Sequence, residues 1–359
     1  MGYNHRMEPV PQTFSTSDHK NIPTTIRDVA KKAGVGLGTV SRVINQSPNV
    51  SETTRQRVLQ IIEDLDFHPS PIARRLALQK TLTIAAVAPF FTRSSMVERL
   101  RGVELTISGT EYDLIIFNVE TPERHDVVLE SLSRRERVDG VLLISLRLTK
   151  AQLQQFQSAG IPIVMVDIND PNLEGVNRIT VDDEHGGWQA VTHLVDLGHR
   201  RIGYISDPFN GNDAFDASYR RYDGYLRALH EAGLHDDERF HLHGYHGRYE
   251  ACELAERMLD LPDRPTAIFA ASDKQAIGVL EAARDRGLRV PEDLSVVGYD
   301  DVEIAEYLGL TTVRQQLFES GEHGVLLLLK ALEQSDSPAT NIVLPTELII
   351  RKSTGKAPV

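Results

Sequence analysis

The spacing of apolar residues divides the chain into two regions with different hydrophobic patterns, and they meet near residue 80. Between residues 25 and 66, apolar side chains recur every three or four positions, which places them on one face of a helix. From Leu82 onward, short runs rich in Val, Ile, Leu and Ala alternate with longer amphipathic stretches. The first pattern predicts a small helical unit, and the second predicts an α/β body in which strands and helices alternate.

The helical unit carries start and stop signals for three helices. The first should begin at Thr25, where Asp28 can complete a capping box, and should end at Gly34. The second should cover 37–45, and the third should follow the cap residue Ser51. Two short helices joined by a glycine turn are typical of a helix-turn-helix. The side chains expected to face inward are Ile26, Val29, Ala30, Ala33, Val35, Val40, Val43, Ile44, Val58, Leu59, Ile61, Ile62 and Leu65.

A fourth and shorter helix is predicted over 72–78. The pair Ser70-Pro71 supplies a cap and a suitable first helical residue. The segment carries Arg74, Arg75 and Leu76 but has almost no core of its own to enter. Because so short a helix is marginal alone in water, we expect it to form only with a partner. A charged linker is the alternative interpretation of the two arginines.

The body contains eight predicted strands and eight predicted helices. Strands are expected over 83–88, 113–118, 140–145, 162–167, 179–182, 201–206, 266–271 and 295–299. Helices are expected near 95–108, 124–134, 151–159, 185–197, 218–232, 249–259, 274–286 and 318–333. Strands so continuously apolar are typical of parallel sheets with helices on both faces.

Roughly 280 residues are many for one sheet, so we expect two doubly wound lobes with a cleft at the carboxyl ends of their strands. Lobe 1 is predicted to comprise 82–181 and 300–312, and lobe 2 to comprise 182–299 and 313–352. Over the whole chain we predict a polar, disordered leader at 1–23 and a helix-turn-helix domain at 24–69. A hinge with its linker follows at 70–81, and an effector-binding and dimerisation domain at 82–359.

Charge is distributed unevenly along the chain. The net charge of −12 argues by itself against nucleic acid. However, residues 1–80 hold 11 Lys and Arg against 7 Asp and Glu, so +4, while the remainder holds 28 against 44, so −16. A basic unit on an acidic body confines phosphate attraction to one end. A single cysteine, Cys252, and the lack of a long apolar run favour a cytoplasmic protein that neither spans a membrane nor is exported.

Three segments of the helical unit carry a family resemblance: T-I-x-D-V-A-x-x-A-G-V-x-x-x-T-V-S-R-V-x-N, V-S-x-x-T-R and P-x-x-I-A-R-x-L. They resemble the lactose-repressor (LacI/purine repressor) family of transcriptional regulators. The resemblance implies that the second helix enters the major groove and that two hinge helices fold together on an operator. It places DNA contacts at Thr25, Leu37, Gly38, Thr39, Ser41, Arg42, Asn45, Ser51, Thr54, Arg74, Arg75 and Leu76.

The resemblance also assigns roles within that set. Leu76 would open a central base step from the minor groove, because apolar wedges kink DNA by partial intercalation. Arg42 would read a guanine edge, and the hydroxyl and amide side chains would contact phosphates. The sequence departs from the family at Gly36, Leu37 and Gly38, where polar side chains are usual. We therefore expect few direct base contacts beyond Arg42 and some dependence on DNA deformability.

The body resembles the type I periplasmic sugar-binding fold that forms the effector domain of this family. The matching segments are VDGVLLIS, IPIVMVD, HLVDLGHRRIGYIS, PTAIFAASD, VPEDLSVVGYDD and LTTVRQ. Carried over, the effector residues are Phe91, Thr92, Ser145, Asp167, Arg221, Asp273 and Asp301. Carboxylates and arginine suit the hydroxyls of a sugar, and Asp273 is expected to present its carboxylate to the cleft. Asp167 and Asp301 have an alternative as turn residues, and a nucleobase ligand remains open.

Other chemistries are weakly supported. The glycines at 34, 36 and 38 follow a helix rather than a strand, which argues against a dinucleotide fingerprint. His241, His243 and His246 are expected to be solvated rather than metal ligands, and residues 182–185 are expected to start a helix. G-x-S-x-G, P-loop and H-E-x-x-H motifs are absent from the sequence, so we predict neither an enzyme nor a cofactor or metal.

The family resemblance implies a dimeric repressor of sugar-utilisation genes that a small carbohydrate releases from a pseudo-palindromic operator. A purine or nucleoside corepressor is the alternative within the family, and the sign of regulation stays open. A solute-binding receptor without a DNA role is the alternative from another class. Because the C-terminal residues show no heptad repeat, we expect a dimer rather than a tetramer.

Overall fold

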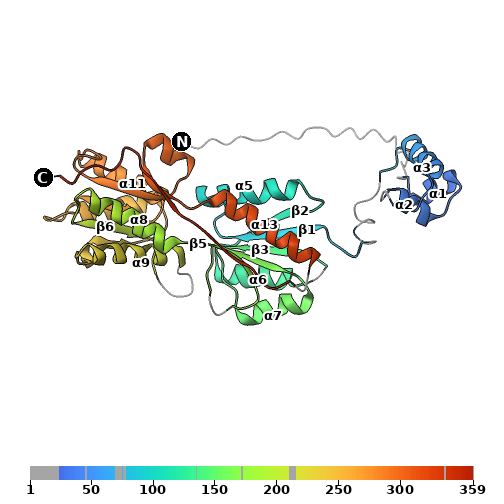
Figure 1. The fold of residues 1–359 in the computed structure, drawn as a ribbon, viewed down its shortest axis with the longest axis horizontal. Helices are drawn as coiled ribbons and strands as arrows, with labels where there is room; N and C mark the ends of the chain where they lie inside the picture. Colours follow the sequence, from blue (N-terminus) through green and yellow to red (C-terminus); the bar gives the residue numbers. More distant parts are fainter. Residues whose placement is uncertain are drawn as a thin grey trace, which may run out of the picture. The chain divides into compact units, whose positions relative to one another are not determined.

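Two compact units make up the chain, one ending at Gln79 and the other beginning at Lys80. The computed structural model describes residues 24–44, 47–68, 75, 78–134, 136–170, 173–209, 216–334 and 337–358 (Figure 1). The predicted leader 1–23 and most of the predicted 72–78 helix therefore lie outside the described residues. The same holds for Asn45, Ser70, Pro71, Arg74 and Leu76.

The N-terminal unit contains the three predicted helices, α1 (Ile26–Ala33), α2 (Leu37–Ile44) and α3 (Glu52–Asp64). The Asp28 carboxylate accepts hydrogen bonds from the backbone N–H and the hydroxyl of Thr25, at 2.9 and 2.7 Å. Gly34 ends α1 in the left-handed region, at φ 63°. The Ser51 hydroxyl accepts from the Thr54 N–H at the start of α3. Local capping therefore defines these helices before any tertiary contact is considered.

The core of this unit follows the predicted inward positions with two corrections. Its fully buried side chains are Val29, Ala30, Ala33, Val40, Val43, Val58 and Phe67. Leu59 was expected inside, but it lies one position beyond Val58, on the outer side of α3, and is 43% exposed. Phe67 was not predicted, because it follows the last helix rather than continuing its periodicity.

Two six-stranded sheets form the second unit, and we call them lobe 1 and lobe 2 (Figure 1). The strands of lobe 1, in spatial order, are β11 (Asn341–Leu344), β5 (Asn177–Val181), β4 (Ile163–Val166), β3 (Gly140–Ile144), β1 (Thr83–Ala88) and β2 (Asp113–Asn118). Those of lobe 2 are β12 (Glu347–Ile349), β10 (Thr311–Arg314), β9 (Ser295–Asp300), β8 (Ala267–Ala270), β6 (Ile202–Ser206) and β7 (His241–His243). All pairs are parallel except β10 with β12.

Helices cover both faces of each sheet, as the doubly wound prediction requires. In lobe 1, α5 (Ser94–Ser108) and α13 (Leu317–Glu333) pack on one face, and α6 (Pro122–Leu132) and α7 (Lys150–Ala159) on the other (Figure 1). In lobe 2 the corresponding pairs are α8 (Asp183–Asp196) with α9 (Asp216–Glu231), and α10 (Arg248–Leu259) with α11 (Asp273–Asp285). The short helices η2 (Glu238–Phe240) and α12 (Glu303–Leu308) complete lobe 2.

The chain crosses between the lobes at places other than those predicted. Residues 300–312 were expected in lobe 1, but β10 pairs with β9 inside the lobe 2 sheet. Residues 313–352 were expected in lobe 2, but α13 packs against α5 and β11 pairs with β5, both in lobe 1. The last two residues of β10, the strand β12 and the C-terminal segment do lie in lobe 2, where the Val296 N–H donates to the Ser353 carbonyl at 2.8 Å. The cause is that β10 and β11 are four-residue strands with polar positions, too short and mixed to be recognised from apolar runs.

Burial of the strands is uneven. β1, β3, β4 and β8 are buried along their whole length, as expected of parallel strands between helical layers. The edge strand β2 is not, because Ile115 and Ile116 are both more than 40% exposed. In the described part of the chain, none of the helices has the length and apolar character needed to cross a membrane.

Candidate functional site

The outer surface of α2 is small and carries one charge. Val40 and Val43 face the core, while Arg42 is exposed and Leu37 is 45% exposed. Gly38 also lies on the surface, with open space where a side chain would be. The predicted contacts Thr39 and Ser41 are half-buried. A single guanidinium beside an apolar side chain and a glycine therefore forms the surface that this helix presents.

Hydroxyl side chains gather at the amino ends of α1 and α3. Thr25 precedes α1, Ser51 precedes α3, and the hydroxyls of Ser51 and Thr54 are 2.9 Å apart. The Arg55 guanidinium donates to the Ser47 carbonyl at 2.5 Å, which joins α3 to the segment just before it. Helix amino ends offer free N–H groups to phosphates, so both positions suit backbone contacts to DNA. Of the predicted hinge contacts, Arg75 lies within the described residues and is half-buried.

A second cluster lies where β3 and β4 end in lobe 1. Ser145 and Asp167 follow these strands directly, and both adopt positive φ angles, 51° and 68°. The Ser145 hydroxyl donates to Asp167 Oδ2 at 2.6 Å, and Arg99 Nη1 lies 3.2 Å from the same oxygen. The other oxygen, Asp167 Oδ1, is buried and has no hydrogen-bond partner among the described residues. A buried acceptor without a donor is costly, so Asp167 Oδ1 is suited to accept a hydrogen bond from a bound molecule.

Arg99 was not predicted as a site residue, although it organises this cluster. Its Nε donates to the Ser320 hydroxyl at 2.8 Å, and its Nη2 lies 3.4 Å from Gln315 Oε1. These contacts are reached because α5 and α13 approach closely at two glycines. A Cβ on Gly102 or Gly321 would collide with the backbone of the opposite helix. An arginine within an amphipathic helix gave no sequence sign that it would be buried.

In lobe 2, Arg221 lies on α9 and is a buried cation. Its Nε donates to Asp183 Oδ1 at 2.8 Å, and its Nη1 donates to the Ala271 carbonyl at 2.7 Å. Its guanidinium also stacks 3.7 Å from the centre of the Tyr299 ring. Asp182 caps α8 by accepting from the His185 N–H, as predicted, but Asp183 was not recognised as the arginine's partner. Arg221 thus links α8, α9 and β8 at the carboxyl end of the sheet.

Asp300, at the end of β9, is a site residue that the sequence analysis missed. It is buried at φ 114°, and its carboxylate accepts a hydrogen bond from Gln315 Nε2. Burial raises the pKa of Asp300 to about 6, against the opposing effect of Arg221, the Gln315 bond, His246 and Arg99. Arg221 and His246 belong to lobe 2 and Arg99 to lobe 1, so Asp300 lies where the strand ends of the two lobes approach one another.

Asp301, which was predicted instead, has a structural role. Its carboxylate forms ion pairs with Arg314 and Arg351 at 2.8 and 2.7 Å, and the side chain is only 5% exposed. These pairs join β9, β10 and the C-terminal segment. The sequence placed the two aspartates at the correct end of the strand, but it did not show which of them faces the site.

Asp273 does not present its carboxylate to the site, contrary to the prediction. It is 0% exposed, and its two oxygens accept from the Val302 N–H at 2.9 Å and the Thr312 hydroxyl at 2.5 Å. Because Ser272 is the cap and Asp273 the first residue of α11, the side chain turns toward β9 and β10 instead. Burial raises the pKa of Asp273 well above its ordinary value, with Asp300 adding to the shift.

Another polar cluster surrounds Asp207, which follows β6. Its carboxylate lies 3.2 Å from His246 Nδ1, 3.4 Å from Gln275 Nε2 and 3.5 Å from the Ser218 hydroxyl. His246 was expected to be solvated, but its side chain is only 11% exposed. Arg93 at the start of α5 interacts electrostatically with Asp207 and Asp300, although burial lowers its pKa. Residues of both lobes therefore contribute to one charged region.

Phe91, Thr92 and His241 were also singled out in the sequence, the first two as effector contacts and the third as a solvated histidine. Phe91 and Thr92 follow β1 and are exposed, Phe91 by 41%, so an aromatic face is available at this end of lobe 1. His241 is not solvated: it stacks 4.0 Å from Tyr222, and burial lowers its pKa to about 4. Among the described residues, His, Cys, Asp and Glu form no cluster suited to a metal.

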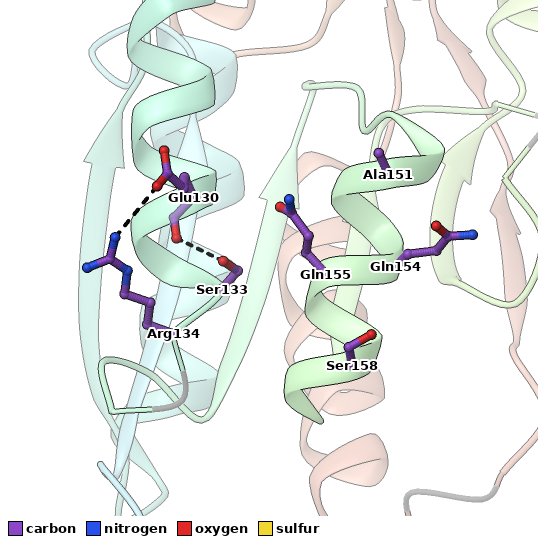
Figure 2. Close-up of a pocket in the computed structure, with 7 residues that line it drawn as sticks. All are labelled: Glu130, Ser133, Arg134, Ala151, Gln154, Gln155 and Ser158. Atoms are coloured by element: carbon purple, nitrogen blue, oxygen red, sulfur yellow. Dashed lines mark hydrogen bonds and ion pairs between the residues drawn. The ribbon is translucent and has the colours of Figure 1, made fainter.

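An open groove lies elsewhere, on the outer surface of lobe 1 between α6 and α7. Figure 2 shows Gln155 turned toward α6 and Gln154 turned away from it. Glu130 and Arg134 form an exposed ion pair of 3.6 Å on the facing helix. The groove measures about 630 Å³ and is lined by Glu130, Ser133, Arg134, Ala151, Gln154, Gln155 and Ser158. It contains none of the predicted site residues.

Comparison with known proteins places both units. Residues 25–70 match the model of bacterial regulatory proteins of the lacI family, and residues 191–354 match a periplasmic binding protein-like domain. Catabolite control protein A of Priestia megaterium is 32% identical over 92% of this chain and 99% of its own. The HTH-type transcriptional repressor PurR of Mannheimia succiniciproducens is 35% identical over 92% and 99%.

Two solved structures extend the likeness to the whole fold. The transcriptional regulator CelR in complex with cellobiose is 33% identical, with a TM-score of 0.69, over 92% of this chain and 99% of its own. The lac repressor dimer bound to operator and the anti-inducer ONPF is 28% identical, with a TM-score of 0.81, over 93% and 99%.

Proposed function

Because the chain belongs to the lacI family of bacterial regulatory proteins and is a DNA-binding transcriptional repressor, we propose that it binds an operator as a homodimer and is released by a small carbohydrate. The observation that best supports a carbohydrate ligand is Asp167 Oδ1, which has no hydrogen-bond partner among the described residues and lies in the cluster of Ser145, Asp167 and Arg99. The relatives named above are regulators rather than enzymes.

The charged region between the lobes suits a polyhydroxylated ligand. Asp167 Oδ1 is an acceptor that a sugar hydroxyl can satisfy, and Arg93 with Asp300 adds a donor and an acceptor nearby. The exposed Phe91 ring can cover an apolar sugar face. The solved CelR complex contains cellobiose, which supports a sugar as the first class to test.

The three chain crossings between the lobes form a hydrogen-bonded hinge that can respond to such a ligand. The Asp182 N–H donates to the Leu344 carbonyl at 3.2 Å, and the Thr346 hydroxyl donates to the Asp182 carbonyl at 3.5 Å. Gln316 Nε2 donates to the Pro345 carbonyl at 3.2 Å. A ligand that contacts both lobes binds one arrangement of this hinge more tightly and so shifts the population toward it.

On the DNA side, we propose that α2 enters the major groove with Arg42 as the base reader and Leu37 as an apolar contact. Phosphate contacts would come from Thr25, Thr39, Ser41, Asn45, Ser51 and Thr54, with Gly38 allowing close approach. The hinge would add Arg74, Arg75 and the wedge Leu76. The basic charge of residues 1–80 supports this orientation, since the acidic remainder repels DNA.

For the homodimer, lobe 1 offers an apolar surface at its sheet edge. Ile116 is exposed on the side of β2 that faces α5, and Val97 and Leu105 are exposed on α5, which contacts β2, whereas the exposed Ile115 points to the opposite side of the sheet. Exposed apolar side chains gathered on neighbouring elements are typical of protein interfaces. The lac repressor structure is a dimer, which supports pairing of two copies.

A purine or nucleoside corepressor is the second candidate, and the 35% identity to PurR favours it. A thermal-shift panel of mono- and disaccharides, purine bases and nucleosides separates the two, because a ligand that binds only the folded state raises the melting temperature. We expect a sugar to raise it and Asp167→Ala to abolish the shift. A shift by purines alone, or an undiminished sugar shift in the variant, would reject the carbohydrate site.

A further inference from the structure

The carboxylate of Asp139 holds the two residues that precede the first strand of lobe 1. Its Oδ1 accepts a hydrogen bond from the Thr81 N–H at 2.9 Å, and its Oδ2 accepts from the Leu82 N–H at 2.8 Å. Each oxygen therefore receives one of two consecutive backbone donors. Hydrogen bonds to an ionised carboxylate are roughly twice as strong as neutral ones.

The carbonyl groups of the same two residues are also bonded to lobe 1. The Thr83 hydroxyl donates to the Thr81 carbonyl at 3.0 Å, and the Asp113 N–H donates to the Leu82 carbonyl at 2.8 Å. All four backbone polar groups of Thr81 and Leu82 thus have partners in the lobe. Leu82 is buried at φ 48°, a conformation that a leucine keeps only where its surroundings fix it.

We call the hydrogen bonds between the Asp139 carboxylate and the backbone of Thr81 and Leu82 the Asp139 clamp. The clamp and the proposed ligand site lie at opposite ends of the same two strands. Asp139 precedes β3 and Ser145 follows it, while Thr81 and Leu82 precede β1 and Phe91 follows it. The two strands pair in parallel, with Ile84 opposite Gly140, and both are buried along their whole length. A buried strand pair is a rigid element, so a displacement at its carboxyl end reaches its amino end.

We propose that Asp139 is a positioning residue that fixes the point where the chain from the DNA-binding unit enters lobe 1. Through it, movement of β1 and β3 is passed to the linker. Without the clamp, Thr81 and Leu82 become part of the linker, which is then longer and more flexible. Movement of lobe 1 then has less effect on the positions of the DNA-binding units. The coupling part rests on the proposed function, whereas the clamp itself does not.

The test compares Asp139→Asn with wild type in the full-length chain. The amide keeps one acceptor oxygen but turns an NH2 group toward the second backbone N–H, so one bond is lost. Hydrogen exchange at the Thr81 and Leu82 amides and the rate of tryptic cleavage after Lys80 are measured. We expect both to rise at least tenfold while amides inside β1 and β3 stay protected. Glu136→Gln, an exposed acid three residues away, is the matched control and should change neither.

If Asp139 only stabilises lobe 1, hydrogen exchange in Asp139→Asn gives a different result. In that case exchange rises together through Ile84, Val141 and their neighbours, and the proposal is overturned. Unchanged exchange at Thr81 and Leu82 overturns it as well. If Asp139→Asn does not fold, Thr83→Val replaces it, because it removes the hydroxyl bond to the Thr81 carbonyl with a side chain of similar shape.

The coupling is tested on a DNA duplex that the wild-type protein selects from a random-sequence library. We expect Asp139→Asn to bind this duplex about tenfold more weakly while responding normally in the thermal-shift panel. Local loosening with unchanged DNA affinity would overturn the coupling. If the wild-type protein selects no sequence, the proposed function fails, and the exchange and cleavage rates still decide whether the clamp exists.

Discussion

At the scale of single residues, the strand ends were predictable but the directions of their side chains were not. The family resemblance, carried over residue by residue, named Ser145 and Asp167, which directly follow β3 and β4, and Arg221, which lies within α9. Asp273 and Asp301 were placed correctly along the chain, yet their carboxylates turn to Thr312 and Arg351. Orientation depends on tertiary partners that are distant in sequence.

Asp300 gives the residue-scale prediction on pH. Its folded pKa of about 6 exceeds the ordinary value of 3.8, because burial disfavours the charged form. The stability that the neutral carboxyl contributes is therefore fully present below pH 3.8 and is lost as the pH rises through 6. Asp300→Asn should be more stable than wild type at pH 7.5, by at most about 3 kcal/mol, and the difference should disappear near pH 4.

Urea unfolding of both proteins across this pH range measures the difference, and Glu136→Gln serves as an exposed control with a flat profile. A difference between Asp300→Asn and wild type that is constant with pH would show that the carboxyl does not titrate in this range.

Arg42 gives the residue-scale prediction on DNA. It is exposed on α2 and is the only charged residue of that helix. A lost bidentate contact to a base typically costs about 1–3 kcal/mol. Arg42→Ala should therefore weaken binding to the selected duplex by about 5- to 150-fold and relax the preference at one base pair. Arg57→Ala, an exposed arginine of α3, is the control in the same gel-shift titration. Equal losses on selected and random duplexes would show that Arg42 contacts only phosphates.

At the scale of elements, the apolar pattern predicted eight strands and eight helices close to their observed bounds. It missed β7, β10, β11 and β12, which are three or four residues long and carry polar side chains. These short strands form because they pair with neighbouring strands, not because their own residues strongly prefer a strand. A single sequence therefore gives little sign of them. The mistaken lobe assignment of 300–352 follows from these missed strands.

The crossing of α5 and α13 gives the prediction at this scale. Gly321 lies against the backbone of Arg99, and a methyl group there would force the two helices apart. Gly321→Ala should destabilise the protein by roughly 1–3 kcal/mol and weaken sugar binding, because Arg99 would lose Ser320. Gly109→Ala, at the end of α5 with its nearest neighbour 3.7 Å away, should be nearly neutral. Equal stability of the two variants in thermal unfolding would contradict the close packing.

At the scale of the whole molecule, the charge distribution confines DNA binding to residues 1–80 and leaves ligand binding to the acidic remainder. Residues 1–80 carry the positive excess, and the remainder carries 28 basic against 44 acidic residues. DNA binding should therefore be strongly salt-dependent, with affinity for the selected duplex falling about tenfold or more between 50 and 200 mM salt. Fluorescence anisotropy over this range measures it. An affinity that does not change with salt would contradict phosphate contacts by the basic unit.

A sugar bound at Asp167 should lower the affinity of the protein for DNA. The most direct measurement is the affinity of the full-length protein for its selected duplex, with and without the sugar that raises its melting temperature. We predict a loss of at least tenfold in wild type and no change in Asp167→Ala. An affinity that stays constant with bound sugar, or that falls equally in the variant, would show that a sugar at Asp167 does not release the protein from DNA.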